Sequence, residues 1–213
     1  MAFNHIVKSK YDPLVNPYPF KAPSTLPNPP FPKLDPRTRT RLGIEAFREG
    51  LTQLSRLTLI LDNDAMIKSG TGFVTSNSQA LQQYDILAVT PLTETAFQHA
   101  CITMSELKPF SIDIISLDLA SAPRLPFYLK RSTVGAALAN GVVFEIAYGP
   151  AVGSSQRDDQ DLTTARRNLF SGAREILRVT NGKGVILSSA AADVMGLRGP
   201  YDVMNLYVSF YVV

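Results

Sequence analysis

Six short runs of apolar and often β-branched residues are spaced along this chain, and they constrain its fold more than any other feature. Most of the runs are almost continuously apolar, which is typical of strands buried on both faces of a parallel sheet. Segments with helical periodicity separate several of them, and this alternation predicts an α/β fold with a parallel sheet. The runs are Phe3–Val7, Leu57–Leu61, Ile86–Val89, Ile112–Leu117, Val142–Ala147 and Val185–Ser189.

Three segments between these runs have the residue spacing of helices, namely Thr93–Met104, Ser132–Asn140 and Leu162–Val179. The third has the clearest apolar stripe along one face. Aspartates precede it and Arg178 lies in its last turn, an arrangement that the helix dipole favours. Gly141 is placed to end the second helix. We therefore expect helices on the connections between the buried strands.

A proline-rich stretch follows the first run, with 9 of the 15 prolines between Tyr11 and Pro36. Proline lacks an N–H donor and fixes φ, so this stretch cannot form a regular helix or a central strand. We expect a surface loop over residues 11–41, either extended or ordered by a partner. The spacing of Arg37, Arg39 and Arg41 would place all three on one side of an extended segment. They form either a solvated linker end or an arm that contacts phosphate.

Composition sets broad limits on the kind of protein. The length of 213 residues suits one domain, and the formal net charge of +3 is weak support for an anionic partner. Basic residues concentrate toward the two ends of the chain and acidic residues in the middle. This distribution reflects either ordinary solvated surface or a basic face for nucleic acid and an acidic face for protein partners. Cys101 is the single cysteine, which excludes an internal disulfide and a cysteine-based zinc site. No apolar run is long enough to cross a bilayer, so we expect no membrane partner.

Polar residues near the carboxyl ends of the predicted strands are where catalytic groups of a parallel α/β barrel would gather. Only two histidines occur, His5 and His99, and they do not form a His-x-His pair. Multinuclear phosphoesterase sites need more imidazole ligands than this. No Gly-x-Ser-x-Gly elbow or P-loop spacing is present, so we predict no catalytic and no metal-ligating residue. The strand-end candidates considered are Asn4, His5, Asp62, Asp64, Thr90, Asp118, Tyr148, Ser188 and Ser189.

Basic residues are stronger candidates for function. Lys130 and Arg131 follow the aromatic pair Phe127-Tyr128, and such a segment can bind phosphate and stack on unpaired bases. The alternative is a buried aromatic pair beside two solvated cations. Arg198 precedes a proline suited to the first turn of a helix, and it either clamps a phosphate or pairs with a nearby aspartate, Asp193 or Asp202. Three arginines share one face of the predicted helix Leu162–Val179, and this face is either solvated or RNA-binding. They are Arg167, Arg174 and Arg178.

Four short strings in the second half of the chain carry a resemblance to a known family. They are Leu125–Arg131 (LPFYLKR), Phe144–Ala151 (FEIAYGPA), Ile186–Ala191 (ILSSAA) and Arg198–Val203 (RGPYDV). In this order they resemble the thirty-kilodalton protein subunit of RNase P and RNase MRP, over roughly residues 2–206. The resemblance implies a PHP-like TIM (β/α) barrel. It also implies an incomplete barrel over 1–213, without the first strand and helix and the last helix and strand, ending in an atypical tail at 207–213.

The resemblance further implies a non-catalytic, RNA-binding subunit that supports RNA-catalysed removal of 5′ leaders from precursor tRNA, and rRNA processing. No cofactor is expected on the protein itself, and Mg ions are expected with the RNA component. The implied partners are RNase P RNA, RNase MRP RNA, a small Pop-five-type subunit and the other RNase P/MRP proteins, in the nucleus and nucleolus. The acidic middle, Asp62–Asp118, is expected to face protein. The expected RNA-binding residues are Lys130, Arg131, Arg198, Ser188, Ser189, Arg167 and Arg174, the two serines being either RNA contacts or loop-packing residues.

Two other functions remain open at this point. One is an active metal-dependent PHP-type phosphoesterase, against which the shortage of histidines argues. The other is a purely structural scaffold subunit without direct RNA contact. Because RNA contact through phosphates depends strongly on salt, the salt dependence of RNA affinity separates the scaffold from the RNA-binding subunit.

Overall fold

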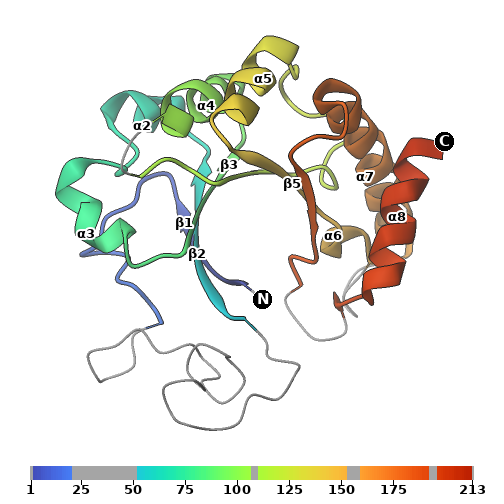
Figure 1. Cartoon of the computed structure of the whole chain (residues 1–213), viewed down its shortest axis with the longest axis horizontal. Helices are drawn as coiled ribbons and strands as arrows, with labels where there is room; N and C mark the ends of the chain where they lie inside the picture. Colours follow the sequence, from blue (N-terminus) through green and yellow to red (C-terminus); the bar gives the residue numbers. More distant parts are fainter. Residues whose placement is uncertain (1, 21–51, 107–109, 153–158, 192–195, 213) are drawn as a thin grey trace, which may run out of the picture.

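A computed structural model describes residues 2–20, 52–106, 110–152, 159–191 and 196–212. Its centre is one sheet of six parallel strands in which each strand pairs with the next one along the chain. The sheet curves strongly, and helices lie along its outer side (Figure 1). All six predicted strands are confirmed: β1 (Ala2–Lys8), β2 (Leu54–Leu61), β3 (Ile86–Pro91), β4 (Ile114–Leu117), β5 (Val143–Ala147) and β6 (Val185–Ser188).

From β2 onward, helices connect successive strands, and the three predicted helices are among them. The segment expected over Thr93–Met104 is α4 (Glu94–His99), which passes into the wider π-helical turn η2 (Ala100–Met104). Gly141, at φ +87°, follows the second predicted helix and ends it as expected. The second and third predicted helices are α5 (Arg131–Ala139) and α7 (Asp159–Thr180). The remaining described helices are α2 (Asp64–Ser69), η1 (Thr75–Asn77), α3 (Ser78–Leu81), α6 (Gly149–Val152) and α8 (Pro200–Val212).

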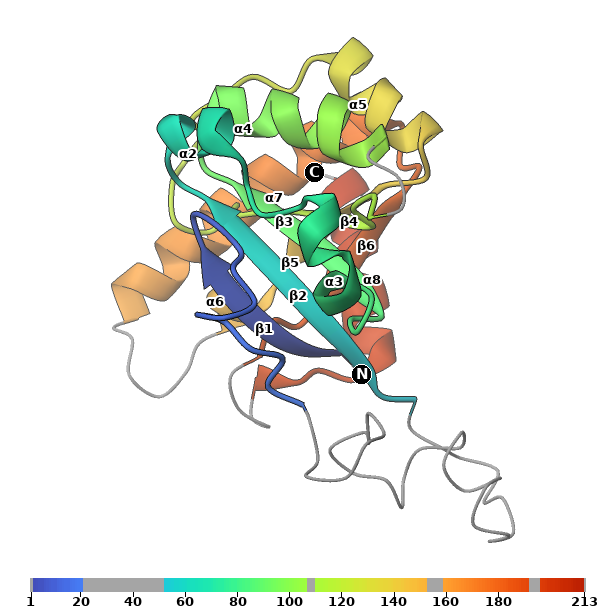
Figure 2. The same cartoon turned by 90° about the vertical axis from the view of Figure 1, so that its left-hand side faces the viewer.

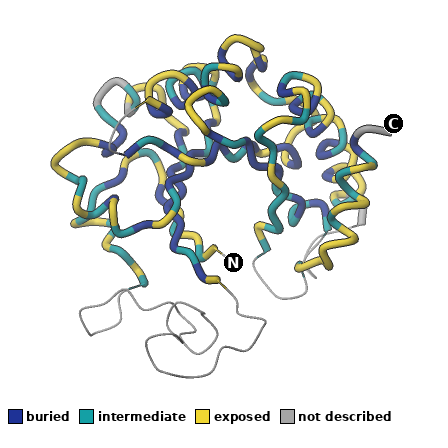
Figure 3. The backbone as a smooth tube through the Cα atoms, viewed as in Figure 1, coloured by how far each residue is buried: buried dark blue, intermediate teal, exposed yellow. Residues whose placement is uncertain are grey.

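The two faces of the sheet differ in composition because alternate residues of each strand point to opposite sides. The outward face packs under the helices with residues such as Leu57, Leu59 and Phe144, each almost completely buried. Figure 3 shows this buried layer following the strands around the curve. The inward face carries polar residues near its centre, and its isoleucines on the outermost strands are open to solvent: Ile6 is 57% and Ile186 is 36% exposed.

Strands β1 and β6 are the outermost strands of the sheet and do not pair with each other. Figures 1 and 2 show the curved sheet as an open wall with its helices on one side. The architecture is that of an open, incomplete TIM barrel, in agreement with the predicted fold class.

Both ends of the described chain use aromatic residues to pack on this wall. Tyr11 is buried beside Gly72, whose missing side chain lets the Tyr11 backbone approach, and Tyr18 packs against Tyr84 at a ring-centroid distance of 4.9 Å. The remainder of the predicted proline-rich loop, with Arg37, Arg39 and Arg41, lies outside the described residues.

The tail that the resemblance marks as atypical is helical over its described residues, Tyr207–Val212. Residues up to Val212 continue α8, and Phe210 is buried against Phe170 of α7, with the two ring centroids 5.0 Å apart. Only the outer side of this helix keeps apolar residues in solvent, such as Val208, which is 57% exposed. The tail therefore contributes to packing because its aromatic spacing fits one face of a helix.

Candidate nucleic-acid interface

Asn4 and His5 are predicted to lie at the carboxyl end of the first strand, and this prediction is wrong. Asn4 and His5 occupy the middle of β1, because the strand continues to Lys8. His5 faces the helical side, where its Nδ1 lies 2.6 Å from the hydroxyl of Tyr84, and burial lowers the pKa of its imidazole. A neutral imidazole bonded to the tyrosine that precedes β3 packs on the helical side of the sheet.

The carboxylates that follow the strands are engaged within the fold. Asp62 accepts a hydrogen bond from the Ser9 hydroxyl, and Asp64 accepts one from the Thr93 hydroxyl. Asp118 accepts from the backbone N–H groups of Ala120 and Ser121. Within the described residues, no three histidine, cysteine or acidic side chains group closely enough to hold a metal ion. These carboxylates thus hold the strand ends and loops in place.

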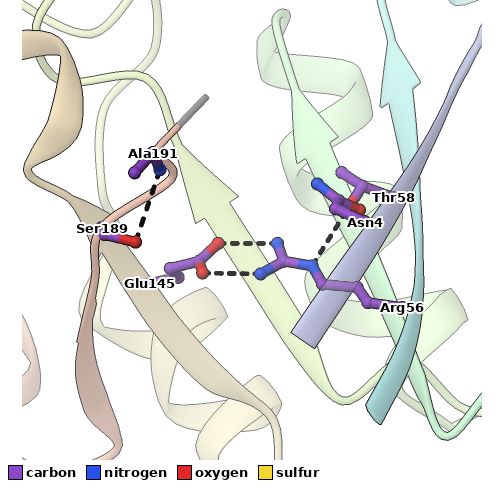
Figure 4. A network of polar contacts seen from close by, with 6 residues as sticks. All are labelled: Asn4, Arg56, Thr58, Glu145, Ser189 and Ala191. Carbon is purple, nitrogen blue, oxygen red and sulfur yellow. Dashed lines mark hydrogen bonds and ion pairs between the residues drawn. The ribbon is translucent and has the colours of Figure 1, made fainter. Parts of the chain in front are cut away.

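A buried ion pair spans the inward face of the sheet. Arg56 of β2 donates from Nη1 and Nη2 to the two carboxylate oxygens of Glu145 on β5, both at 2.6 Å (Figure 4). Only 8% of Arg56 and 3% of Glu145 is exposed. Burial by itself raises the pKa of Glu145, but the hydrogen bonds and charge of Arg56, helped by Ser116 and Ser188, outweigh burial and lower it. The pair is therefore ionised and joins strands on opposite sides of the curve.

The same arginine extends the polar network toward the edge of the sheet. Its Nε donates to the Thr58 hydroxyl at 2.9 Å, and that hydroxyl donates to Oδ1 of Asn4 at 2.7 Å. Figure 4 shows the chain of contacts from Glu145 of β5 through Arg56 and Thr58 of β2 to Asn4 of β1. Each of the three guanidinium nitrogens of Arg56 donates a hydrogen bond within the fold, which makes this network a structural brace.

On the outer side, the predicted aromatic and basic segment divides into a buried and an exposed part. Phe127 is buried and stacks on Phe97 with ring centroids 4.7 Å apart, whereas Tyr128 is 62% exposed. Lys130 precedes α5, and its Nζ lies 3.4 Å from the half-exposed Glu94 carboxylate. Of the aromatic pair, Phe127 is therefore a core residue and Tyr128 is not. Tyr128 presents its ring to solvent next to the two basic residues.

Arg131 joins this segment to the end of α7. Its Nη2 lies 3.4 Å from the backbone carbonyl of Arg178 and from Oδ1 of Asn181. Arg178 and Arg174 line one open cavity of about 570 Å³ between α7 and α8. We call Lys130, Arg131, Arg174 and Arg178 the outer basic surface. All four are exposed and come from two helices that the fold brings together.

The remaining predicted residues lie elsewhere. Arg167 is exposed on α7 but is not among the residues that line this cavity. The Ser188 hydroxyl is buried near Glu145, and the Ser189 hydroxyl accepts from the N–H of Ala191 at 3.4 Å, as a loop-packing role predicts. Arg198 is exposed and makes no ion pair with Asp202; Asp193 lies outside the described residues.

Three of the four resemblance-bearing strings meet at the carboxyl ends of β5 and β6. Gly149 lies against the backbone of Ser189, and a side chain at position 149 would overlap the Ser189 carbonyl oxygen. The hydroxyl of Tyr148 accepts the backbone N–H of Arg198 at 3.4 Å. The sequence strings that are far apart along the chain thus form one corner of the molecule.

Comparison with known proteins identifies the family. The model of the family described as RNase P subunit p30 matches residues 1–211. The chain belongs to the RNase P subunit p30 family. The resemblance predicted from the four strings is therefore confirmed.

Three curated relatives of this p30-family chain come from one animal and two fungi. Ribonuclease P protein subunit p30 of Mus musculus is 38% identical over 157 residues, covering 74% of this chain and 51% of the relative. Probable ribonuclease P protein subunit 3 of Schizosaccharomyces pombe is 34% identical, covering 71% and 55%. Ribonuclease P/MRP protein subunit RPP1 of Saccharomyces cerevisiae is 30% identical, covering 79% and 50%. The chain spans about half the length of these relatives.

The fold has a counterpart among solved structures. A chain of the cryo-EM structure of archaeal ribonuclease P with mature tRNA superposes with a TM-score of 0.53 over 97% of this chain and 73% of that chain. The two sequences are 10% identical, so this likeness concerns the fold alone.

The Arg56–Glu145 pair of this p30-family chain was missed in the sequence analysis. Its signal was a charged residue in or beside an otherwise apolar run, at Arg56 before Leu57–Leu61 and at Glu145 within Val142–Ala147. Buried charges of this kind require a partner, but the sequence does not say which strand supplies it. Cys101 is buried, and burial raises the pKa of its thiol to about 12. In the described parts of the chain, no helix combines the length and hydrophobicity required to cross a membrane.

Proposed function

We propose that this chain is an RNA-binding subunit of RNase P and RNase MRP, and that it contributes no catalytic residue. Catalysis would belong to the RNA component, with its Mg ions, in removing 5′ leaders from precursor tRNA and in rRNA processing. The observation that carries the proposal is the outer basic surface beside the exposed ring of Tyr128. Cations of this kind bind phosphates, and an exposed aromatic ring stacks on unpaired bases.

The arrangement of charge supports binding over catalysis. The cations on the outer surface face solvent, whereas Glu145 is already neutralised by Arg56. The carboxylates at the strand ends accept hydrogen bonds from within the fold. These features favour an RNA-binding subunit over a phosphoesterase, whose carboxylates and imidazoles would have to converge on metal ions.

Family membership supports the partners that we propose. They are the RNase P and RNase MRP RNAs, a small Pop-five-type subunit and other proteins of the particle, acting in the nucleus and nucleolus. The acidic residues of Asp62–Asp118 are our proposal for a surface that faces protein. Arg198, Arg167 and Ser189 stay as proposed secondary RNA contacts, and we propose that Ser188, whose hydroxyl is buried, packs the loop.

The test is purification of the tagged chain from its source cells, with sequencing of the RNA that co-purifies. We expect RNase P and MRP RNAs with the wild type and a loss of both with Lys130→Glu/Arg131→Glu. The matched control is Lys8→Glu/Lys10→Glu, which makes the same charge change at two exposed positions at and after the end of β1. Circular dichroism and a thermal melt establish that both variants remain folded.

In vitro, the same variants separate direct binding from a scaffold role. Each phosphate contact removed lowers the slope of log affinity against log salt concentration by about one. A wild type whose RNA affinity does not depend on salt, or a double variant with the wild-type slope, would assign the outer basic surface no role in RNA binding.

A further inference from the structure

A second pocket lies at the carboxyl end of β5, between α6, α7 and α8. It is lined by Tyr148, Arg166, Leu169, Phe170, Arg198 and Leu206, among others, and has a volume of about 240 Å³. Pockets that hold drug-sized ligands begin at about 300 Å³. This one is therefore large enough for a single ring system with a small polar group, but not for an extended molecule.

The floor of the pocket is apolar and partly aromatic. Leu169 is buried, and Leu206 and Phe170 are half-buried. Phe170 is held in place by its contact with Phe210. A flat, poorly hydrated ring fits such a floor, because stacking and burial of apolar area do not require specific hydrogen bonds.

The polar groups around the floor are all hydrogen-bond donors. Arg166 donates from Nε to the carbonyl oxygen of Ala151 at 3.0 Å, which orients the guanidinium, and its two Nη groups have no partner among the described residues. Arg198 has no ion-pair partner in the described part of the chain. Tyr148 is 5% exposed, and its hydroxyl accepts from the backbone of Arg198 while its own proton meets no acceptor among the described residues. Two cations and a phenol proton select a ligand with an anionic, acceptor-rich group.

We propose that this pocket receives one unpaired nucleotide of the bound RNA, with its base on the apolar floor and an adjacent phosphate on Arg166 and Arg198. The inference rests on the proposed RNA-binding function and adds an unpaired nucleotide to it as the ligand. Both requirements, a flat ring and an anion beside it, are met by a nucleotide that is turned out of a helix or lies in a loop.

The position of the pocket fits a strand that also contacts the outer basic surface. Arg166 and Arg174 both lie on α7, and the helical rise separates them by about 12 Å. Phe170 lines the pocket, and its partner Phe210 lines the open cavity beside Arg174 and Arg178. One RNA segment that follows α7 therefore reaches both sites, with phosphates on the arginines and one base in the pocket.

The experiment compares a fluorescein-labelled single-stranded RNA of about 12 nucleotides with the same strand in a duplex, using fluorescence anisotropy and the full chain. A duplex keeps its bases paired, so only the single strand can fill the pocket. We expect Arg198→Ala to weaken single-strand binding about tenfold, and Phe170→Leu and Tyr148→Phe to weaken it several-fold. All three should leave duplex binding within a factor of two. Thermal melts of each variant check that the domain stays folded.

The reference variant is Lys130→Glu/Arg131→Glu, which should weaken the binding of both RNAs. If the pocket variants bind the single strand as the wild type does while the reference variant loses both RNAs, the pocket assignment is wrong and the proposed function stands. If the pocket variants lose both RNAs equally, the pocket contacts only the backbone and the base assignment is wrong. If the wild type binds neither RNA, the proposed function itself fails.

A protein ligand is a separate outcome of the same variants. If Arg198→Ala leaves both RNA affinities unchanged and instead loses a protein subunit from the purified particle, the pocket binds an acidic side chain and the nucleotide assignment is overturned.

Discussion

The inner wall of the sheet and the outer basic surface treat charge in opposite ways. On the inner wall, Arg56 and Glu145 are buried and hydrogen-bonded to each other at 2.6 Å. On the outer surface, Arg131, Arg174 and Arg178 are exposed, and Nη2 of Arg131 lies 3.4 Å from the backbone carbonyl of Arg178 and from Oδ1 of Asn181. The comparison separates charge that holds the fold together from charge that is accessible to a polyanion. In a barrel of this type, the inner wall near the strand ends is where catalysis is usual.

The largest effect should follow from removing one member of the buried pair. Glu145→Leu leaves the guanidinium of Arg56 buried without a partner, and we expect it to lower the free energy of unfolding by about 3–5 kcal/mol. Urea denaturation measures the change. The double variant Arg56→Met/Glu145→Leu should recover most of the loss, since an apolar pair of similar size carries no buried charge. A single variant as stable as the wild type would show that the pair does not brace the wall.

A second prediction concerns the close packing between the carboxyl ends of β5 and β6, where Gly149 lies against Ser189. Gly149→Ala places a methyl group on the Ser189 carbonyl oxygen, so the loop after β6 must move. We expect a loss of about 1–3 kcal/mol in unfolding free energy, the usual cost of overpacking. Gly135→Ala is the matched control, because a methyl group on α5 at this position meets no atom within 4 Å. Equal stability of the two variants would contradict the close packing at Gly149.

The pH dependence of stability should reflect the same buried pair. The pKa of Glu145 is lower in the folded protein than its ordinary value of 4.5, so the unfolded chain binds more protons as the solution becomes acidic. The contribution of the pair is therefore complete above pH 4.5 and is lost as the pH falls through the lowered pKa. Urea midpoints measured between pH 7 and pH 3 should fall more steeply for the wild type than for Arg56→Met/Glu145→Leu. Parallel curves would mean that other carboxylates dominate the acid sensitivity.

The smallest effect on stability should come from the outer surface. Lys130 and Glu94 are about half exposed and 3.4 Å apart, and ion pairs of this kind contribute less than about 1 kcal/mol. We expect Lys130→Ala to change the unfolding free energy by less than about 0.5 kcal/mol and yet to lower the salt dependence of RNA affinity. A large loss of stability in this variant would remove the distinction between the two regions.

Much of the fold could be predicted because its signals are local. Buried parallel strands are continuously apolar, and the third predicted helix has an apolar stripe, so both appear in a short window of sequence. Short elements such as α3 and α6 could not be predicted, because a helix of one turn has no periodicity to detect. Asn4 and His5 do not lie at a strand end, because the predicted run Phe3–Val7 already places them inside the strand, as the observed bounds of β1 do.

The candidate site could be predicted only in part, for a related reason. Lys130 and Arg131 are adjacent in sequence, so their grouping is local, whereas their contact with Arg178 depends on how α5 packs beside α7. Phe127 and Tyr128 are similar residues with opposite exposures, and only the packing of Phe97 decides between them. Whether RNA binds these residues remains a prediction.

The order of the strands has a consequence for how the chain folds as it is synthesised. Each strand pairs with the one that precedes it, so the sheet can grow by one strand and one connection at a time from the amino-terminal side. The Arg56–Glu145 contact does not follow this order, since 89 positions separate its two residues. It forms only after β5 has emerged from the ribosome and the sheet has curved, and until then Arg56 must stay hydrated. A fluorescent or exchange-based probe near Arg56 would therefore report when the contact between β2 and β5 forms during synthesis.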